Sequence, residues 1–208
     1  MKKALSLLLC LMLVFTVGCT GGAEDNSSDQ TASLSKIEKS VKEGKFDTVK
    51  YGIGDNAEEV KSYYQKLASD YAYAHSSEVE GEDAEHNHNH EIDEDFAFFQ
   101  EVYRENYTLF KTASERFYCR AGKVIAVSCD STVFGFTPAV TNKYEVEEKI
   151  TTKGETVKAK VQDLVFNPFA PEDTIILRYN IDDYQLDFYF YENLLLSAVI
   201  IDKERWPS

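Results

Sequence analysis

Three of the four histidines lie at alternate positions in one acidic segment, as His86, His88 and His90. From 78 to 95, nine of eighteen residues are Asp or Glu, and none is Lys or Arg. Alternate spacing places the three imidazoles on one side of an extended segment, where neutral imidazole nitrogens and carboxylates can bind Zn²⁺. His75 is the nearest candidate for a fourth ligand. The alternative is a solvated acidic insertion without a physiological metal, and no other cofactor is indicated.

Sequence motifs for enzymatic chemistry are missing. The chain contains no H-E-x-x-H, C-x-x-C or G-x-S-x-G motif, no phosphate-binding glycine loop and no dinucleotide fingerprint. A pair of dispersed acidic residues could serve a hydrolase, but most of these side chains must be surface charge. The sequence therefore favours a protein that is not an enzyme.

Cys19 follows an N-terminal segment that is typical of bacterial export. Lys2 and Lys3 precede an apolar run over 4–17, which is shorter than the roughly 20 residues of a membrane-spanning helix. A small residue directly before Cys19 resembles a bacterial lipobox, although Thr16 stands where Leu is preferred. The resemblance implies cleavage before Cys19 and attachment of diacylglycerol to its thiol. The alternative is an ordinary cleaved signal peptide.

These features predict a lipoprotein signal peptide over 1–18 and a flexible tether, rich in small and polar residues, over 19–32. The expected location is the extracytoplasmic face of the cell membrane, with the lipid on Cys19 as the anchor. A net charge of −14 excludes the usual kind of nucleic-acid-binding protein and disfavours attraction to anionic lipid.

The rest of the chain contains two sets of similar segments in the same order. An Asn-x-x-Glu-Val segment at 56–60 and again at 142–146 predicts a capped helix start. Alternating apolar residues on both sides of short turns predict two hairpins, with turns at 121–122 and 192–193. The inward face of the second hairpin is expected to carry Tyr184, Leu186, Phe188 and Phe190. An additional strand is expected before each hairpin, over 107–111 and 174–180.

The predicted fold class is therefore α+β, in two layers, with two tandem repeats of a helix plus a three-stranded antiparallel meander. The first repeat is expected over 33–133, with the acidic His-rich insertion at about 75–95, and the second over 134–208.

Cys119 and Cys129 are expected to remain free thiols. A two-residue turn pairs Cys119 with Val124 and places Cys129 opposite Ser114, on the other face of the sheet and about five residues away. This separation exceeds the reach of a disulfide.

Tyr189 and Tyr191 lie on the outward face of the second predicted hairpin, where they alternate with Gln185 and Asp187. One interpretation is an exposed surface that docks a protein or wall polymer, since Tyr gives a large contact area at small entropic cost. The alternative is a second core layer.

The tandem Gly-Ile and Gly-Phe, helix and meander segments behind a lipobox resemble an uncharacterised family of Gram-positive lipoproteins. Its repeats are similar to those of β-lactamase-inhibitor protein and the small outer-membrane assembly lipoproteins. The resemblance covers 46–206, but 65–68 lacks the Leu-Gly-x-Pro that commonly ends the first helix. It implies a fold and the binding of proteins or envelope components, with no catalytic residue.

The function predicted from the sequence is thus non-catalytic binding of a protein or cell-envelope ligand by a membrane-anchored lipoprotein. The first alternative is capture or sensing of zinc by the His-rich segment. A weaker alternative, by analogy of fold alone, is inhibition of an extracellular hydrolase.

Overall fold

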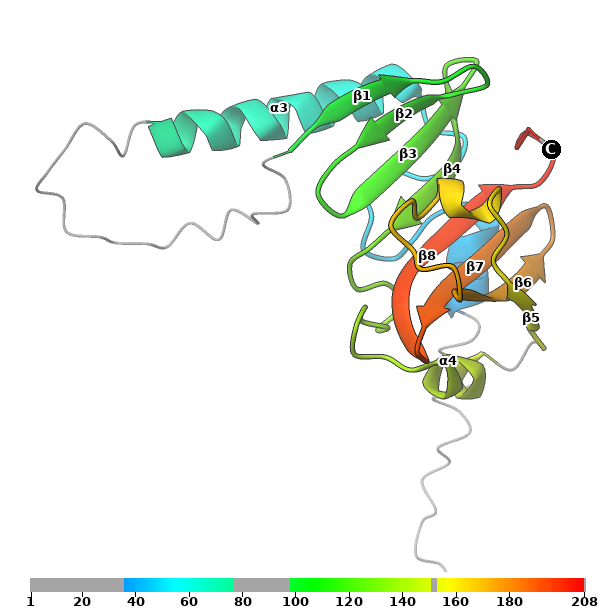
Figure 1. The fold of residues 1–208 in the computed structure, drawn as a ribbon. Coiled ribbons are helices and arrows are strands. Elements are labelled where there is room, and N and C mark those ends of the chain that lie inside the picture. Colours follow the sequence, from blue (N-terminus) through cyan, green and yellow to red (C-terminus); the bar gives the residue numbers. More distant parts are fainter. Residues whose placement is uncertain (1–35, 77–97, 151–152, 208) are drawn as a thin grey trace, which may run out of the picture. The chain divides into compact units, whose positions relative to one another are not determined.

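A computed structural model describes residues 36–76, 98–150 and 153–207 (Figure 1). Eight strands form one antiparallel sheet in the order β1-β2-β3-β4-β8-β7-β6-β5. The strands are β1 (Gln100–Tyr103), β2 (Thr108–Lys111), β3 (Glu115–Arg120), β4 (Lys123–Cys129), β5 (Glu155–Lys158), β6 (Ile175–Ile181), β7 (Tyr184–Tyr191) and β8 (Leu194–Asp202). The helical segments are residues 36–42, α3 (Ala57–Ser76), α4 (Lys143–Lys149) and the short 3₁₀ helix η3 (Asp163–Val165).

The predicted fold of two separate helix plus three-stranded repeats in two layers is wrong. The last strands of the two halves, β4 and β8, pair with each other, with Ala126 opposite Ile201 and Cys129 opposite Ala198. This pairing satisfies two strand edges that separate sheets would leave open, so all eight strands share one sheet. The edge strands β1 and β5 were not predicted, because they are short and largely exposed and lack a clear apolar alternation.

The main core lies between one face of the sheet and the helices. Val60 and Tyr64 of α3, Val146 of α4 and Val41 of the first helix are all buried in it. The predicted inward face of β7 is confirmed, since Tyr184, Leu186, Phe188 and Phe190 all pack here. The three helices therefore cover the same face of the sheet.

Both predicted hairpin turns are confirmed. Ala121 and Gly122 have φ of 51° and 75°, and Glu192 and Asn193 have φ of 48° and 71°. Positive φ at both central residues is the geometry of a type I′ turn, whose twist matches that of the flanking strands. A register shift interrupts each ladder, after Tyr118 in the first hairpin and after Tyr189 in the second.

Cys119 and Cys129 are both buried free thiols. Cys119 pairs with Val124 as predicted, but the register shift places Cys129 opposite Glu115 rather than Ser114. Both thiols consequently lie in the main core instead of on opposite faces. Four residues of β3 still separate the two positions, which corresponds to about 14 Å at ~3.4 Å per residue. That separation is too large for a disulfide.

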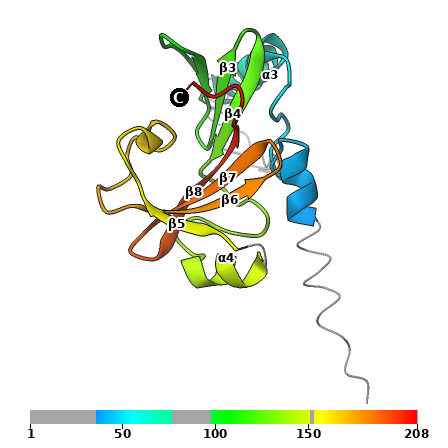
Figure 2. The same cartoon turned by 90° about the vertical axis from the view of Figure 1, so that its right-hand side faces the viewer.

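The opposite face of the sheet is covered by the connection 159–174, which joins β5 to β6. In Figure 2 this connection lies on one side of the sheet and the helix 36–42 lies on the other. The connection contributes Phe166 to a second core that also contains Tyr118, Ile125, Ile176, Tyr189 and Val199, with Trp206 packed against it. Within the part of the chain described here, no helix has the length and apolar character that crossing a membrane requires.

Candidate binding site

The connection 159–174 is fixed to the sheet by hydrogen bonds from side chains to its backbone. Tyr118 and Tyr189 donate hydrogen bonds of 2.9 and 3.0 Å to carbonyl oxygens of residues 165 and 163. Ser128 donates one of 3.2 Å to the carbonyl of Phe166. These buried hydroxyl groups therefore have partners, as their removal from water requires. The connection forms a fixed wall over the sheet.

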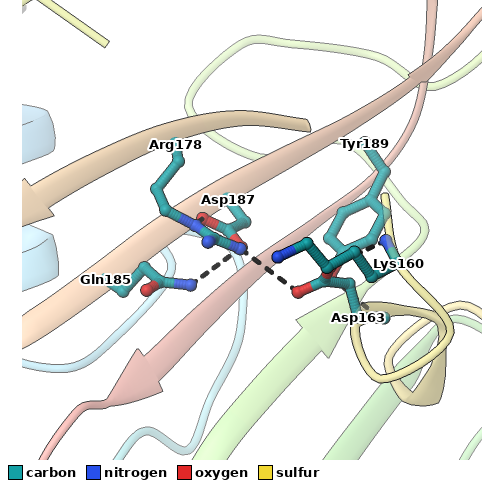
Figure 3. Close-up of polar contacts among 6 residues, drawn as sticks. All are labelled: Lys160, Asp163, Arg178, Gln185, Asp187 and Tyr189. Atoms are coloured by element: carbon teal, nitrogen blue, oxygen red, sulfur yellow. Dashed lines mark hydrogen bonds and ion pairs between the residues drawn. The ribbon is translucent and has the colours of Figure 1, made fainter. Parts of the chain in front are cut away.

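An ion pair on this face lies under the same wall. Arg178 of β6 and Asp187 of β7 are direct cross-strand neighbours, and the guanidinium binds the carboxylate through Nε and Nη2 at 2.9 and 2.8 Å (Figure 3). Gln185 donates a further hydrogen bond of 2.9 Å to Asp187. Arg178 Nη2 also lies 3.4 Å from Asp163 of η3, so the ion pair joins the sheet to the connection.

Burial and pairing act in opposite directions on this pair. The side chain of Asp187 has no exposed surface, and this burial raises the pKa of its carboxyl group while the hydrogen bond from Arg178 opposes the rise. The same hydrogen bond raises the pKa of Arg178 further above its ordinary value. A bidentate guanidinium–carboxylate pair with an added amide donor is the arrangement that makes a buried charge tolerable.

A hollow of about 380 Å³ opens beside this ion pair. Its lining combines aromatic rings, amides and charged groups of both signs, which include Phe166, Trp206, Gln162, Gln185, Arg178, Lys203 and Asp163. Its volume is within the range of small-ligand sites. The hollow can accept a group that is partly apolar and partly hydrogen-bonding.

Trp206 is held in place at the edge of the second core. Its ring centroid lies 4.6 Å from that of Phe166 and 5.5 Å from that of Tyr118. The chain turns toward this position directly after β8, where Asp202 accepts hydrogen bonds of 3.0 and 3.1 Å from the backbone N–H groups of Glu204 and Arg205. The ring is half-buried, so part of it is left to line the hollow.

The charged groups around the hollow already form ion pairs or hydrogen bonds within the protein. Asp187 and Asp163 neutralise Arg178, and the Lys203 ammonium donates a hydrogen bond to the backbone carbonyl of Asp182. Because these side chains are already paired, they are held in fixed orientations and make the site rigid. A ligand would meet Trp206 and the amide of Gln185 in a preformed setting.

The structure separates the two tyrosines that the sequence singled out. Tyr189 is fully buried, and its hydroxyl is part of the contact with the connection. Its burial fits the alternative of a second core layer and leaves no surface on this side chain for docking. Tyr191, at the end of β7, is half-buried.

The predicted lipidation and metal-site residues lie outside the described residues or at the end of α3. Cys19, His86, His88 and His90 lie outside the described residues, and His75 lies in the last turn of α3. Within the ranges that the structure describes, no three His, Cys, Asp or Glu side chains come close enough together to hold a metal ion.

The alternation of the second hairpin predicts Gln185 and Asp187 on the face of Tyr189, which the register confirms. The same pattern does not predict the role of Arg178 or the position of Trp206. The sequence does contain an indication for Arg178, because it is the only charged residue in the strand Ile175–Ile181. A cation in such a strand requires a nearby anion. The position of Trp206 had no comparable signal.

Comparison with protein-family models, curated proteins and solved structures finds no match to this chain. No residue role is therefore transferred from another protein. The proposal below depends on the residues and contacts already described.

Proposed function

We propose that this protein is a membrane-anchored extracytoplasmic lipoprotein that binds a protein or cell-envelope ligand without catalysing a reaction. The observation that carries the proposal is the hollow beside Trp206, with its mixed aromatic and amide lining. Ligand sites commonly combine an apolar surface with a few fixed polar groups. The space of about 380 Å³ suits one sugar ring or one large side chain of a partner.

The contacts of the charged residues also support binding rather than catalysis. A general base must reach the proton that it removes. Asp187 has no exposed surface and receives three hydrogen bonds of 2.9 Å or less from Arg178 and Gln185. These contacts give Asp187 the role of a support for Arg178 and Gln185, which line the hollow.

Photocrosslinking in intact cells tests this proposal. A photoreactive residue is placed at Gln162, which is exposed and lines the hollow, and at Lys66, which is exposed on α3, as the matched control. We expect a specific crosslinked product from position 162 and none of the same mass from position 66. Mass spectrometry of the product then identifies a protein or an envelope fragment. Identical products from both positions, or none from position 162, would contradict the proposal.

The lipid anchor has its own test, because it concerns residues outside the binding site. The mass of the mature protein from membranes should correspond to a chain that begins at Cys19 and carries a diacylglyceryl group. Cys19→Ser should release the chain from the membrane fraction or leave its leader uncleaved. A mature mass without acyl groups would refute the anchor and leave the binding proposal standing.

Zinc binding remains the alternative function, and the spacing of His86, His88 and His90 in an acidic segment supports it. Calorimetric titration with Zn²⁺ compares the chain from Thr20 to Ser208 with a variant in which all three are Ala. The alternative predicts saturable binding that the triple variant loses. Equal weak binding by both proteins would end it.

A further inference from the structure

A second hollow, of about 360 Å³, lies on the same face of the sheet over β1, β2 and β3. It is bounded on one side by Val165 and Pro168 of the connection and on the other by the sheet. The register explains the lining, because Gln100 pairs with Lys111 and Lys111 pairs with Arg116 across three neighbouring strands. Side chains at directly paired positions lie on the same face of a sheet.

Three cations line this hollow in a chain whose net charge is −14. They are Arg104, Lys111 and Arg116, and no carboxylate is among the lining residues. Within the described part of the chain, Asp130 is the only acidic side chain in an ion pair with any of them, at 2.6 Å from Arg116 Nη1. Among the residues that the structure describes, no carboxylate forms a direct ion pair with Lys111 or Arg104.

Arg116 supplies an independent sign that this hollow takes an anion. The residue is 6% exposed, and its Nε–H is buried without a hydrogen-bond partner among the described residues. A buried guanidinium donor without an acceptor is costly, and an unmatched donor of this kind calls for an explanation. An oxyanion in the hollow, with a small adjustment of the guanidinium, would provide the missing acceptor.

The charge balance favours one class of anion. Asp130 offsets one of the three cations, which leaves two, and a phosphate monoester or inorganic phosphate carries a charge of about −1.5 to −2 near neutral pH. Arg also presents its donors in a planar fork that matches phosphate oxygens, with Lys as an added point charge. Tyr107 lines the same hollow and offers a hydroxyl group as a further donor.

We propose that the hollow formed by Arg104, Lys111 and Arg116 binds a phosphate group. This proposal does not depend on the binding role of the hollow beside Trp206. The two sites are neighbours, because the Tyr107 ring lies 5.7 Å from that of Trp206. A free ion and a monoester within a larger molecule present the same phosphate chemistry, and separate measurements distinguish these two sources.

Calorimetric titration of the full chain with inorganic phosphate and with glycerol 3-phosphate, at constant ionic strength, tests the proposal. We expect saturable binding that Lys111→Gln weakens by about fivefold or more, as loss of one charged contact implies. Lys66→Gln removes the same charge from an exposed position on α3 and should change the affinity less than twofold. Tighter binding of the ester would assign the site to a monoester, and tighter binding of the free ion to inorganic phosphate.

The Nε–H resonance of Arg116 gives a second measurement that does not require a variant at this buried position. It should shift and saturate with the same affinity as the calorimetric signal. The proposal is refuted if the wild-type chain shows no saturable phosphate binding, or if Lys111→Gln and Lys66→Gln weaken it equally. A shift of unrelated resonances with the Arg116 signal unchanged would refute it as well.

Discussion

Asp187 and Arg178 show how one buried pair fixes a whole wall of the candidate site. The pair lies across β6 and β7, and its contact with Asp163 extends it to the connection. Removing Asp187 leaves Arg178, whose side chain is 22% exposed, without its main partner, which is more destabilising than losing a fully exposed ion pair. The energetic importance of this pair follows from its burial rather than from its charge alone.

Asp187→Ala should lower the free energy of unfolding by about 2–3 kcal/mol, because Arg178 loses its main partner and keeps only Asp163, at 3.4 Å. The matched control is Asp173→Ala. Asp173 forms a 2.9 Å pair with Lys158 at 84% and 69% exposure, and its loss should change stability by about 0–1 kcal/mol. Urea denaturation of both variants measures the difference. Equal effects would show that burial does not decide the strength of the pair.

The two core thiols should be unreactive at moderately alkaline pH. Burial raises the pKa of Cys119 to about 12 and that of Cys129 to about 11, and only the thiolate is nucleophilic. Because both folded values are raised, the neutral thiols favour the folded state at low pH. That contribution is lost as the pH rises from the ordinary thiol value through about 11 for Cys129 and about 12 for Cys119.

A colorimetric thiol reagent at pH 8 measures this in a chain that begins at Thr20 and so retains only these two cysteines. The native protein should show no reaction, and the protein in guanidinium chloride should show two reactive thiols. Rapid labelling of either residue in the native state would contradict the burial of that side chain.

At the scale of the element, local sequence signals account for helix starts and hairpins. Asn142 accepts a hydrogen bond of 3.1 Å from the Glu145 N–H, and the Glu145 carboxylate accepts one of 2.8 Å in return. This capping box begins a helix of only seven residues, which is too short to be stable through its own hydrogen bonds. The cap and the burial of Val146 together hold α4 on the sheet.

Asn142→Ala should lower the free energy of unfolding by about 1 kcal/mol, since the Glu145 backbone N–H in the first turn of α4 loses its side-chain acceptor. Glu148→Ala, at an exposed position of the same helix, is the control and should change stability by less than about 0.5 kcal/mol. Thermal or urea unfolding compares the two. A cap variant as stable as the control would show that packing alone positions α4.

Features that depend on neighbouring residues could be predicted from the sequence, and pairings between distant strands could not. The turn at Ala121-Gly122, the cap at Asn142 and the apolar face of β7 depend on neighbouring residues, and their patterns predict them correctly. The pairing of β4 with β8 joins residues about 70 positions apart, so neither strand's pattern contains it. Separate repeats and a shared sheet would give the same alternation in each strand.

The candidate site was less predictable than the fold. The wall of the hollow is the irregular connection 159–174, which has no apolar period and takes its position from hydrogen bonds with Tyr118, Tyr189 and Ser128. The lining comes from several distant segments, so the spacing of residues could not reveal it. The alternation along β7 predicts Gln185 on the same face as Tyr189, but it does not indicate that Gln185 borders a hollow.

At the scale of the whole molecule, the two faces of the sheet have different coverings. The helices and an apolar core cover one face, while the connection and a mixed aromatic and polar layer cover the other. Both hollows that we describe in detail lie on the second face, and each is bounded by the connection. We therefore expect ligand binding on that face and structural support from the other.

The central claim is that the hollow beside Trp206 binds a ligand, and a fluorine label on this residue, the only Trp in the chain, tests it most directly. The full chain, with 5-fluorotryptophan in place of its Trp, is titrated with soluble peptidoglycan fragments and, separately, with detergent-extracted envelope proteins. We predict a saturable change in the ¹⁹F resonance with one of the two, weakened by Gln185→Ala and unaffected by Lys66→Gln. No saturable change with either, in protein that circular dichroism shows to be folded, would contradict the claim.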